Sequence, residues 1–326
     1  MDSLLSFFVQ DPAEAAEQNQ ARLVNALADQ QKTRGGGGET HDAMAIIHTA
    51  MRQLQDEISE LNQQAVDMLL TPGRDLQQAM LILGRATVLL EQLVLLVQVD
   101  QSQGQTREES SDSDSSMNDN MFLWNQPGIS NLSVGNLFIY NKPILLLNDN
   151  NAKHVANSDD LVYMRASLLF NIALTFHSLG TQSGDATQLQ NAILIYDMSF
   201  QAFRQVVNDL PEIKRLPQKD QMYRIQLFLL AAWNNQAQIH HELGNAAHAV
   251  TMLQEQNSLI ADLHHRLLNR NTHDNDMECD NSNNPTKINN NTTNHGEMMK
   301  LVESMLQDFL LNDFVVRSLS MAAPMA

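Results

Sequence analysis

The amino-acid sequence predicts an all-α protein of antiparallel helix pairs, with disordered insertions and one short extended segment. Three observations support this fold class. Apolar residues recur three to four positions apart over long stretches, as in Ile46, Ile47, Met51, Leu54 and Ile58, and this is the period of a helix with one buried face. Only 5% of the residues are aromatic, so Leu, Ala and Met must do most of the packing. A helical motif also occurs twice.

The repeated motif is Asn-x-Ala-x-x-x-His-x-Leu-Gly. It runs from Asn171 to Gly180 and again from Asn235 to Gly244, and the two copies lie 64 positions apart. Self-similarity at such a spacing is typical of stacked helical repeats. We expect each copy to be a helix that its glycine ends, because glycine adopts the left-handed conformation that closes a helix. We also expect Trp233, Ala173 and Ala237 to be buried.

The residues after each glycine predict a second helix that packs on the first. Ala249 and Leu253, and in the earlier copy Ala192 and Tyr196, keep a four-residue spacing. Small residues at such places let two helices approach closely. The pattern resembles the tetratricopeptide repeat (TPR), W-x2-L-G-x2-Y followed by A-x3-F and P. The first-helix positions that match it are Trp233, Ala237 and His240 in one copy and Leu169, Ala173 and Phe176 in the other.

The resemblance covers Leu169 to Leu268, and more loosely Leu61 to Gln98. It departs from the family at Gln236, which replaces an apolar residue, and in the absence of a closing proline. The combination of repeats, the Tyr-Asn-Lys-Pro segment and Asn-rich insertions is similar to an uncharacterised group of algal TPR-like proteins. The resemblance implies a right-handed α-solenoid that binds protein, usually a peptide or helix in its concave face.

Composition limits the classes of partner. With 38 acidic and 20 basic residues the net charge is −18, which argues against nucleic acid or an anionic membrane as partner; the alternative explanation of the charge is solubility alone. Cys279 is the only cysteine, so no intrachain disulfide is expected. We find no signal peptide and no uninterrupted apolar run of bilayer length, and therefore expect a cytoplasmic or nuclear protein that is not secreted.

The chain divides into seven predicted parts. Residues 1–38 form a flexible N-terminal arm that ends in four glycines, 41–100 form the N-terminal helix pair, and 158–270 form the TPR-like pairs. Two low-complexity stretches are predicted to be disordered insertions, an acidic Ser-rich one at 101–130 and an Asn-rich one at 271–296. Residues 131–157 contain an extended segment packed on the helices, and 297–326 a C-terminal capping helix and tail.

The Ser-rich insertion contains two candidate phosphorylation sites. Ser111 and Ser116 each have an acidic residue three positions on, as acidophilic kinases prefer. The alternative is a solvated loop that is never modified.

Enzymatic motifs are not evident, and we expect a non-enzymatic protein without a metal or another cofactor. The nearest candidate is His241-Glu242-Leu243-Gly244-Asn245. A zinc protease needs His-Glu-x-x-His, in which two imidazoles one helical turn apart share the metal. Here Asn245 takes the second place, so the pattern is incomplete.

The residues that would face the concave side are the candidate partner-binding site. A side-chain amide both donates and accepts hydrogen bonds, so an asparagine there can bind a partner's backbone. The alternatives are that Asn171 and Asn235 bond only between helices, and that His177 and His241 only stabilise helix ends. Because no basic residue stands among these positions, we expect a neutral or mildly basic segment rather than an acidic peptide terminus. The candidates are Asn171, Leu174, His177, Ser178, Asn234, Asn235, Gln238, His241 and Glu242.

Two function hypotheses remain at this stage. The first is a scaffold or adaptor that binds an unidentified protein or peptide in the concave face. The second is a structural subunit that packs its helices into an oligomer or larger complex without a free peptide ligand.

Overall fold

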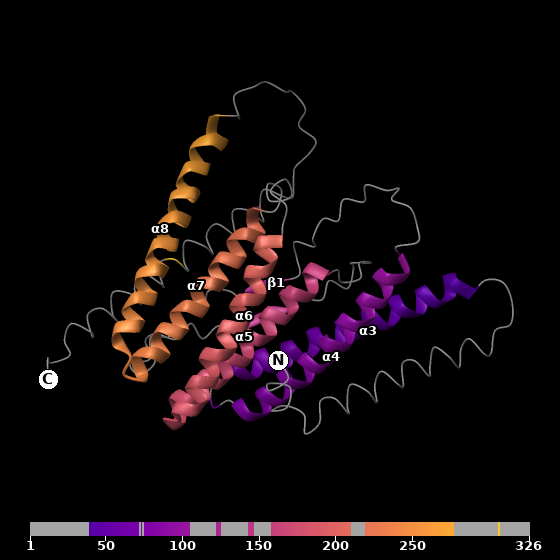
Figure 1. Cartoon of the computed structure of the whole chain (residues 1–326), viewed down its shortest axis with the longest axis horizontal. Coiled ribbons are helices and arrows are strands. Elements are labelled where there is room, and N and C mark those ends of the chain that lie inside the picture. Colours follow the sequence, from indigo (N-terminus) through magenta and orange to yellow (C-terminus); the bar gives the residue numbers. More distant parts are fainter. Residues whose placement is uncertain are drawn as a thin grey trace. The chain divides into compact units, whose positions relative to one another are not determined.

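The computed structural model describes residues 39–71, 73, 75–104, 122–124, 143–146, 158–209, 219–276 and 306. Within them the protein is all-helical apart from two short strands (Figure 1), which confirms the all-α part of the predicted fold class. The elements are α3 (Glu39–Leu70), α4 (Leu76–Gly104), β1 (Phe122–Trp124), β2 (Ile144–Leu146), α5 (Ser158–Ser183), α6 (Ala186–Asp209), α7 (Lys219–Glu242) and α8 (Ala246–Asp276).

The chain forms two compact units. The first comprises Met1–Asn125 and Lys142–Asp209, and the second comprises Gln126–Asn141 and Leu210–Ala326. Helices α3 to α6 and both strands belong to the first unit, and α7 and α8 belong to the second.

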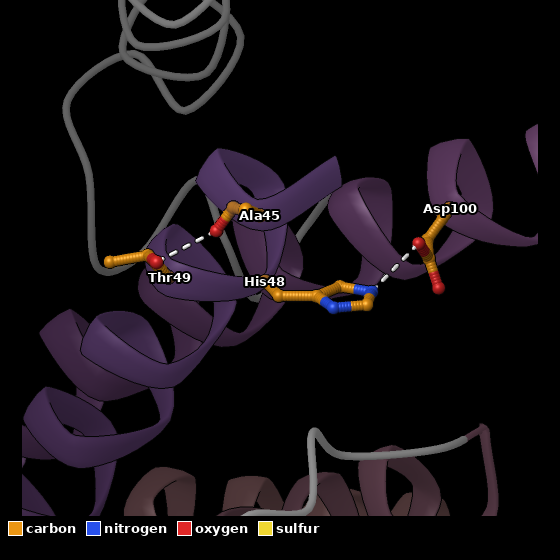
Figure 2. Close-up of polar contacts among 4 residues, drawn as sticks. All are labelled: Ala45, His48, Thr49 and Asp100. Carbon is orange, nitrogen blue, oxygen red and sulfur yellow. Dashed lines mark hydrogen bonds and ion pairs between the residues drawn. The ribbon is translucent and has the colours of Figure 1, made fainter. Parts of the chain in front are cut away.

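Helices α3 and α4 run antiparallel along each other (Figure 1). His48 near the start of α3 lies 3.1 Å from the Asp100 carboxylate near the end of α4, and the two side chains point toward one another (Figure 2). Glu57 and Arg85 pair midway along the helices. At the connection, Asp75 begins α4 by accepting a hydrogen bond from the N–H of Gln78 at 2.9 Å, which satisfies one of the free donors of a helix N-terminus.

Helix α4 packs against α5 as well as α3. At one end Leu179 of α5 packs against a core cluster of Leu69, Leu76 and Ala79. At the other end Arg165 Nη2 lies 2.6 Å from Glu91 Oε1. Two separate contacts, one apolar and one ionic, therefore hold α5 on α4.

The glycine expected to end α5 does not do so. Helix α5 continues through Gly180 to Ser183, and Gly184 ends it with a φ of 69°. Gly180 instead allows α6 to approach closely, because a Cβ there would lie 2.7 Å from Leu189 Cδ2. In the second copy the prediction is correct: Gly244 has a φ of 80° and directly follows the last turn of α7.

The helix pairs α5–α6 and α7–α8 each carry a buried hydrogen bond between their two helices. In the first unit Ser199 Oγ on α6 donates to the carbonyl of Ala166 on α5 at 2.7 Å. In the second unit Gln256 Nε2 on α8 donates to the carbonyl of Leu230 on α7 at 3.2 Å. Both donors stand seven positions after the second-helix alanine of their repeat, and both acceptors stand five positions before the asparagine that begins the repeated motif. This bond supports the internal repeat independently of the motif.

Burial of the motif residues follows the prediction except at tryptophan. Ala173 and Ala237 are buried, and Ala237 packs against Leu253 on α8. Trp233 is only partly buried, so the large aromatic residue does not fill the core of this pair.

The predicted insertions are shorter than expected where the structure describes them. Helix α4 continues to Gly104 and β1 occupies Phe122–Trp124, both within the range 101–130, and α8 continues to Asp276 within the range 271–296. Aromatic and aliphatic residues form β1, and neither glycine nor proline interrupts α8, so helix propagation continues. The other predictions for 1–38, 105–121, 147–157 and 277–326, including Ser111 and Ser116, lie outside the described residues, except that Leu306 is helical and buried.

Helix α4 is long and apolar enough to cross a bilayer by length and composition alone. Within Leu76–Gln101 the most apolar window of 18 residues has a mean hydropathy of 1.9, and half of that window is buried inside the protein. Packing against α3 and α5 accounts for the buried half.

Candidate functional site

An extended segment lies buried against the helices of the first unit. Strand β2 pairs antiparallel with β1, with Ile144 opposite Trp124 and Leu146 opposite Phe122. The side chains of Pro143, Ile144, Leu145 and Leu146 are all buried, and β2 contacts both α3 and α5. The prediction of an extended segment packed on the helices is thus correct for residues 143–146, but its strand partner is β1.

Two asparagines hold the backbone of Ile144. Asn171 Oδ1 on α5 accepts a hydrogen bond from the Ile144 N–H at 2.7 Å, and Asn171 Nδ2 donates to the Ile144 carbonyl at 2.8 Å. Asn62 Nδ2 on α3 donates to the same carbonyl at 3.0 Å, and its Oδ1 accepts from Asn171 Nδ2 at 2.9 Å. We call Asn62 and Asn171 the asparagine clamp. Both residues are fully buried.

The clamp takes the place of a neighbouring β-strand. An extended residue directs its N–H and its C=O to the same edge of the strand, and the next residue directs them to the opposite edge. Ile144 therefore faces the clamp, and Leu145 faces β1. Because an asparagine amide carries the same donor and acceptor types as a peptide group, it satisfies both polar groups of Ile144 inside the apolar interior.

The second unit carries asparagines at the same two repeat positions. Asn171 stands two positions after Leu169, and Asn62 one position after Leu61. On α7 the corresponding positions after Trp233 are Asn235 and Asn234, which are buried, with Asn234 Nδ2 3.4 Å from Asn235 Oδ1.

The remaining candidate residues divide between interior and surface. Leu174, His177 and Ser178 are buried on α5, and His177 packs edge-on against Tyr196 of α6, with 6.3 Å between ring centroids. It therefore faces the second helix of its pair. On α7, Gln238 is buried and donates to Glu242 at 2.9 Å, His241 is partly exposed and Glu242 is exposed.

Sequence reasoning missed two parts of this site. Asn62 was within the loosely matched repeat but was not selected, although an amide in an apolar helical stretch is a signal that could have identified it. Ile144 was within the extended segment, but its backbone N–H and C=O could not be singled out, because almost every residue type has the same backbone groups. The structure brings Asn171 together with these two, and not with His177.

Metal-binding clusters are absent from the described part of the chain, since no group of three His, Cys, Asp or Glu side chains there could hold an ion. The groups at the clamp are amides and aliphatic side chains. Such groups bind a polypeptide backbone and apolar side chains rather than supply a nucleophile or a titrating acid or base.

Comparison with known proteins adds no relative: no protein-family model, no curated protein and no solved structure matches this chain.

His177 is a buried ionisable group on α5 that faces α6. Both of its ring nitrogens are buried without a hydrogen-bond partner. Removal from water disfavours the charged imidazolium and lowers the pKa of His177 from 6.5 to about 3. The ring therefore remains neutral and acts as part of the apolar interior between α5 and α6.

Replacing Asn171 by Ala should destabilise the protein by about 1–3 kcal/mol, because the N–H of Ile144 is left buried without a partner. Urea unfolding followed by circular dichroism measures this. Gln64→Ala, which removes an exposed amide two positions from Asn62, is the control and should change stability by less than about 0.5 kcal/mol. Equal stabilities for the two variants would show that the clamp contributes nothing to folding.

Acidification should destabilise the protein through His177. The unfolded chain takes up a proton at His177 below pH 6.5, whereas the folded protein does so only near pH 3. Stability attributable to this residue is thus complete above pH 6.5 and is lost by about 1.4 kcal/mol per pH unit as the pH falls through that window. Urea midpoints between pH 7.5 and 5 should show a smaller decrease for His177→Phe than for wild type. His241→Phe, at a partly exposed site, should retain the wild-type slope, and identical slopes for all three proteins would refute the assignment.

Proposed function

We propose that this protein is a non-enzymatic interaction module that holds an extended polypeptide segment between the first helices of successive TPR-like pairs. One observation carries the proposal: two buried asparagines, from helices separated by 109 positions in the sequence, together satisfy both backbone polar groups of one extended residue. Residues inside a helix rarely need side-chain amides to satisfy their backbone, because their N–H and C=O groups already bond to one another. The two buried asparagines therefore serve the extended segment rather than the helices.

The clamp is suited to polypeptide because it contacts only the backbone. Its hydrogen bonds go to the N–H and C=O of Ile144 and to the other asparagine. The aliphatic side chains of the segment are buried beside it. Backbone hydrogen bonds supply the affinity for an extended chain, and side-chain burial supplies the preference among chains, as in other modes of strand recognition.

The test supplies the segment from outside. In the full-length Ile144→Pro variant the internal segment lacks the N–H that Asn171 accepts, so a labelled synthetic peptide with the sequence of residues 141–148 should bind with a micromolar Kd, measured by fluorescence anisotropy. Adding Asn171→Ala to this variant should weaken binding at least about tenfold, because one lost hydrogen bond in a buried site amounts to 1–3 kcal/mol. Circular dichroism checks that both proteins keep their helices.

Leu146→Ser provides a second route if Ile144→Pro prevents folding. It leaves every backbone hydrogen bond in place but weakens the burial of the internal segment. If the peptide binds neither variant at millimolar concentration, or binds equally with and without Asn171, the proposed function is wrong.

A second candidate function is that of a structural subunit, and one surface favours it. Helix α4 leaves Leu81, Leu95 and Val99 exposed at 61%, 44% and 42%. Their spacings of fourteen and four positions place them on one face of the helix. Between Leu81 and Val99 the sequence has one acidic residue, Glu91, and Arg165 pairs with it, so the same face of a second copy could approach without bringing unpaired carboxylates together.

Light scattering on a sizing column tests this second candidate. A dimer mass that reverts to the monomer mass in Leu81→Lys/Leu95→Lys would support the structural role, since two buried leucines per subunit would be lost from the interface. The matched control is Gln77→Lys/Gln78→Lys, which adds the same charge at exposed positions of the same helix. A monomer at every concentration would exclude the α4 face as an interface.

A further inference from the structure

We infer that Pro143–Leu146 is an internal ligand of the clamp, which competes with an external ligand of the same chemistry: an extended, neutral or basic segment of another protein, with a proline followed by aliphatic residues. The inference rests on the proposed function and adds the class of ligand and the way binding is controlled. It begins from the fact that the clamp residues are already occupied by the protein's own chain.

The helices around the clamp hold one another without the segment. Glu91 and Arg165 join α4 to α5, and Leu179 of α5 packs on Leu69 and Leu76. None of these contacts involves β2. Removing the segment therefore leaves α3, α4 and α5 in contact, and a second segment finds the two asparagines still at neighbouring positions.

The segment itself is a separate and short element. Strands β1 and β2 have three residues each and form a two-stranded sheet with no third strand among the described residues, and a two-stranded sheet is marginally stable by itself in water. It lies within the 53-residue connection between α4 and α5. Because loop-closure entropy changes slowly with length, freeing the segment from the clamp does not strain the connection between the helices.

The side chains and backbone of the segment define the ligand class. Ile144 must have an N–H, whereas the residue before it is a buried proline, whose preferred extended backbone suits a strand edge. Three aliphatic side chains follow, exposed at 2%, 8% and 3%. A ligand should therefore place a proline immediately before the residue that the clamp holds, and aliphatic residues at and after it.

Charge favours another protein over a second copy of this chain. The net charge is −18, and two copies would repel one another on approach. A neutral or basic segment avoids that repulsion. We therefore assign the ligand to a different protein and treat exchange of the segment between two copies as a contrary outcome.

Tethering sets the strength of the competition. A tethered segment acts at an effective concentration of roughly millimolar, and an external ligand sees an affinity reduced by the fraction of molecules in which the clamp is free. Wild-type protein should therefore bind the external peptide at least about tenfold more weakly than Ile144→Pro does.

The experiment follows the internal segment while the external one binds. The peptide of residues 141–148 is made with ¹³C-labelled leucine, so that its mass differs from that of the protein's own segment, and is titrated into the wild-type chain. Hydrogen–deuterium exchange then reports the amides of Ile144, Leu145 and Leu146 in the protein. We expect exchange of these amides to rise with peptide occupancy while the α3 and α5 amides stay protected and light scattering gives a monomer mass.

Two control peptides test the ligand class. A peptide with proline at the position of Ile144 lacks the N–H that the clamp accepts and should not bind. A peptide with glutamate at the position of Lys142 should bind several-fold more weakly at low salt. Equal binding of all three peptides would overturn the ligand class.

The remaining outcomes separate this inference from the proposed function. Peptide binding to Ile144→Pro, with no displacement of the segment in wild type at saturation, would make β2 a fixed part of the core and overturn the inference alone. Equal affinity for the two proteins would also overturn it. Dimers in which two copies exchange their segments would overturn the assignment of the ligand to another protein, because the ligand would then be a second copy of this chain. Binding to neither protein would refute the proposed function as well.

Discussion

The buried backbone of one extended residue can be hydrogen-bonded only because of the spacing that α3 and α5 have in the first unit. The N–H and C=O of Ile144 lie among helices whose own backbone groups are already paired, and a peptide group buried without hydrogen bonds is costly. Asn62 and Asn171 meet this need only if α3 and α5 lie side by side. The contacts of α4 with both helices maintain that spacing.

Side-chain hydrogen bonds to backbone groups also join the two helices within each pair. Ser199 and Gln256 differ in length and chemistry, yet each reaches from the second helix to the backbone carbonyl at the same repeat position of the first. Close packing makes this reach short enough, since Gly180 and Ala237 remove side chains where the helices approach. Side chains of different type can therefore donate a hydrogen bond to a backbone carbonyl at the same position of the first helix.

Local signals in the sequence predicted much of the helical structure. The closing Gly244 depends only on neighbouring residues and was predicted. The acidic cap Asp185, whose carboxylate accepts from the N–H of Thr187 at 2.8 Å, is equally local. Non-local features could not be predicted. Three residues of β1 acquire their conformation from a partner about twenty positions away, and the choice between Gly180 and Gly184 as the helix end depends on where Leu189 lies. Residue type indicated that the amide of Asn171 can bind a backbone, but it could not show that the backbone belongs to the same chain.

The separation of the clamp residues along the chain also orders their appearance during synthesis. Asn62 is made first, Ile144 follows, and Asn171 comes 27 positions later. At the usual rates of translation of about 5–20 residues per second, the aliphatic segment emerges roughly one to five seconds before the helix that shelters it. During that interval its strand edge and side chains are open to whatever is near the ribosome. Until α5 has formed, these aliphatic side chains lack the helix surface that buries them in the folded protein.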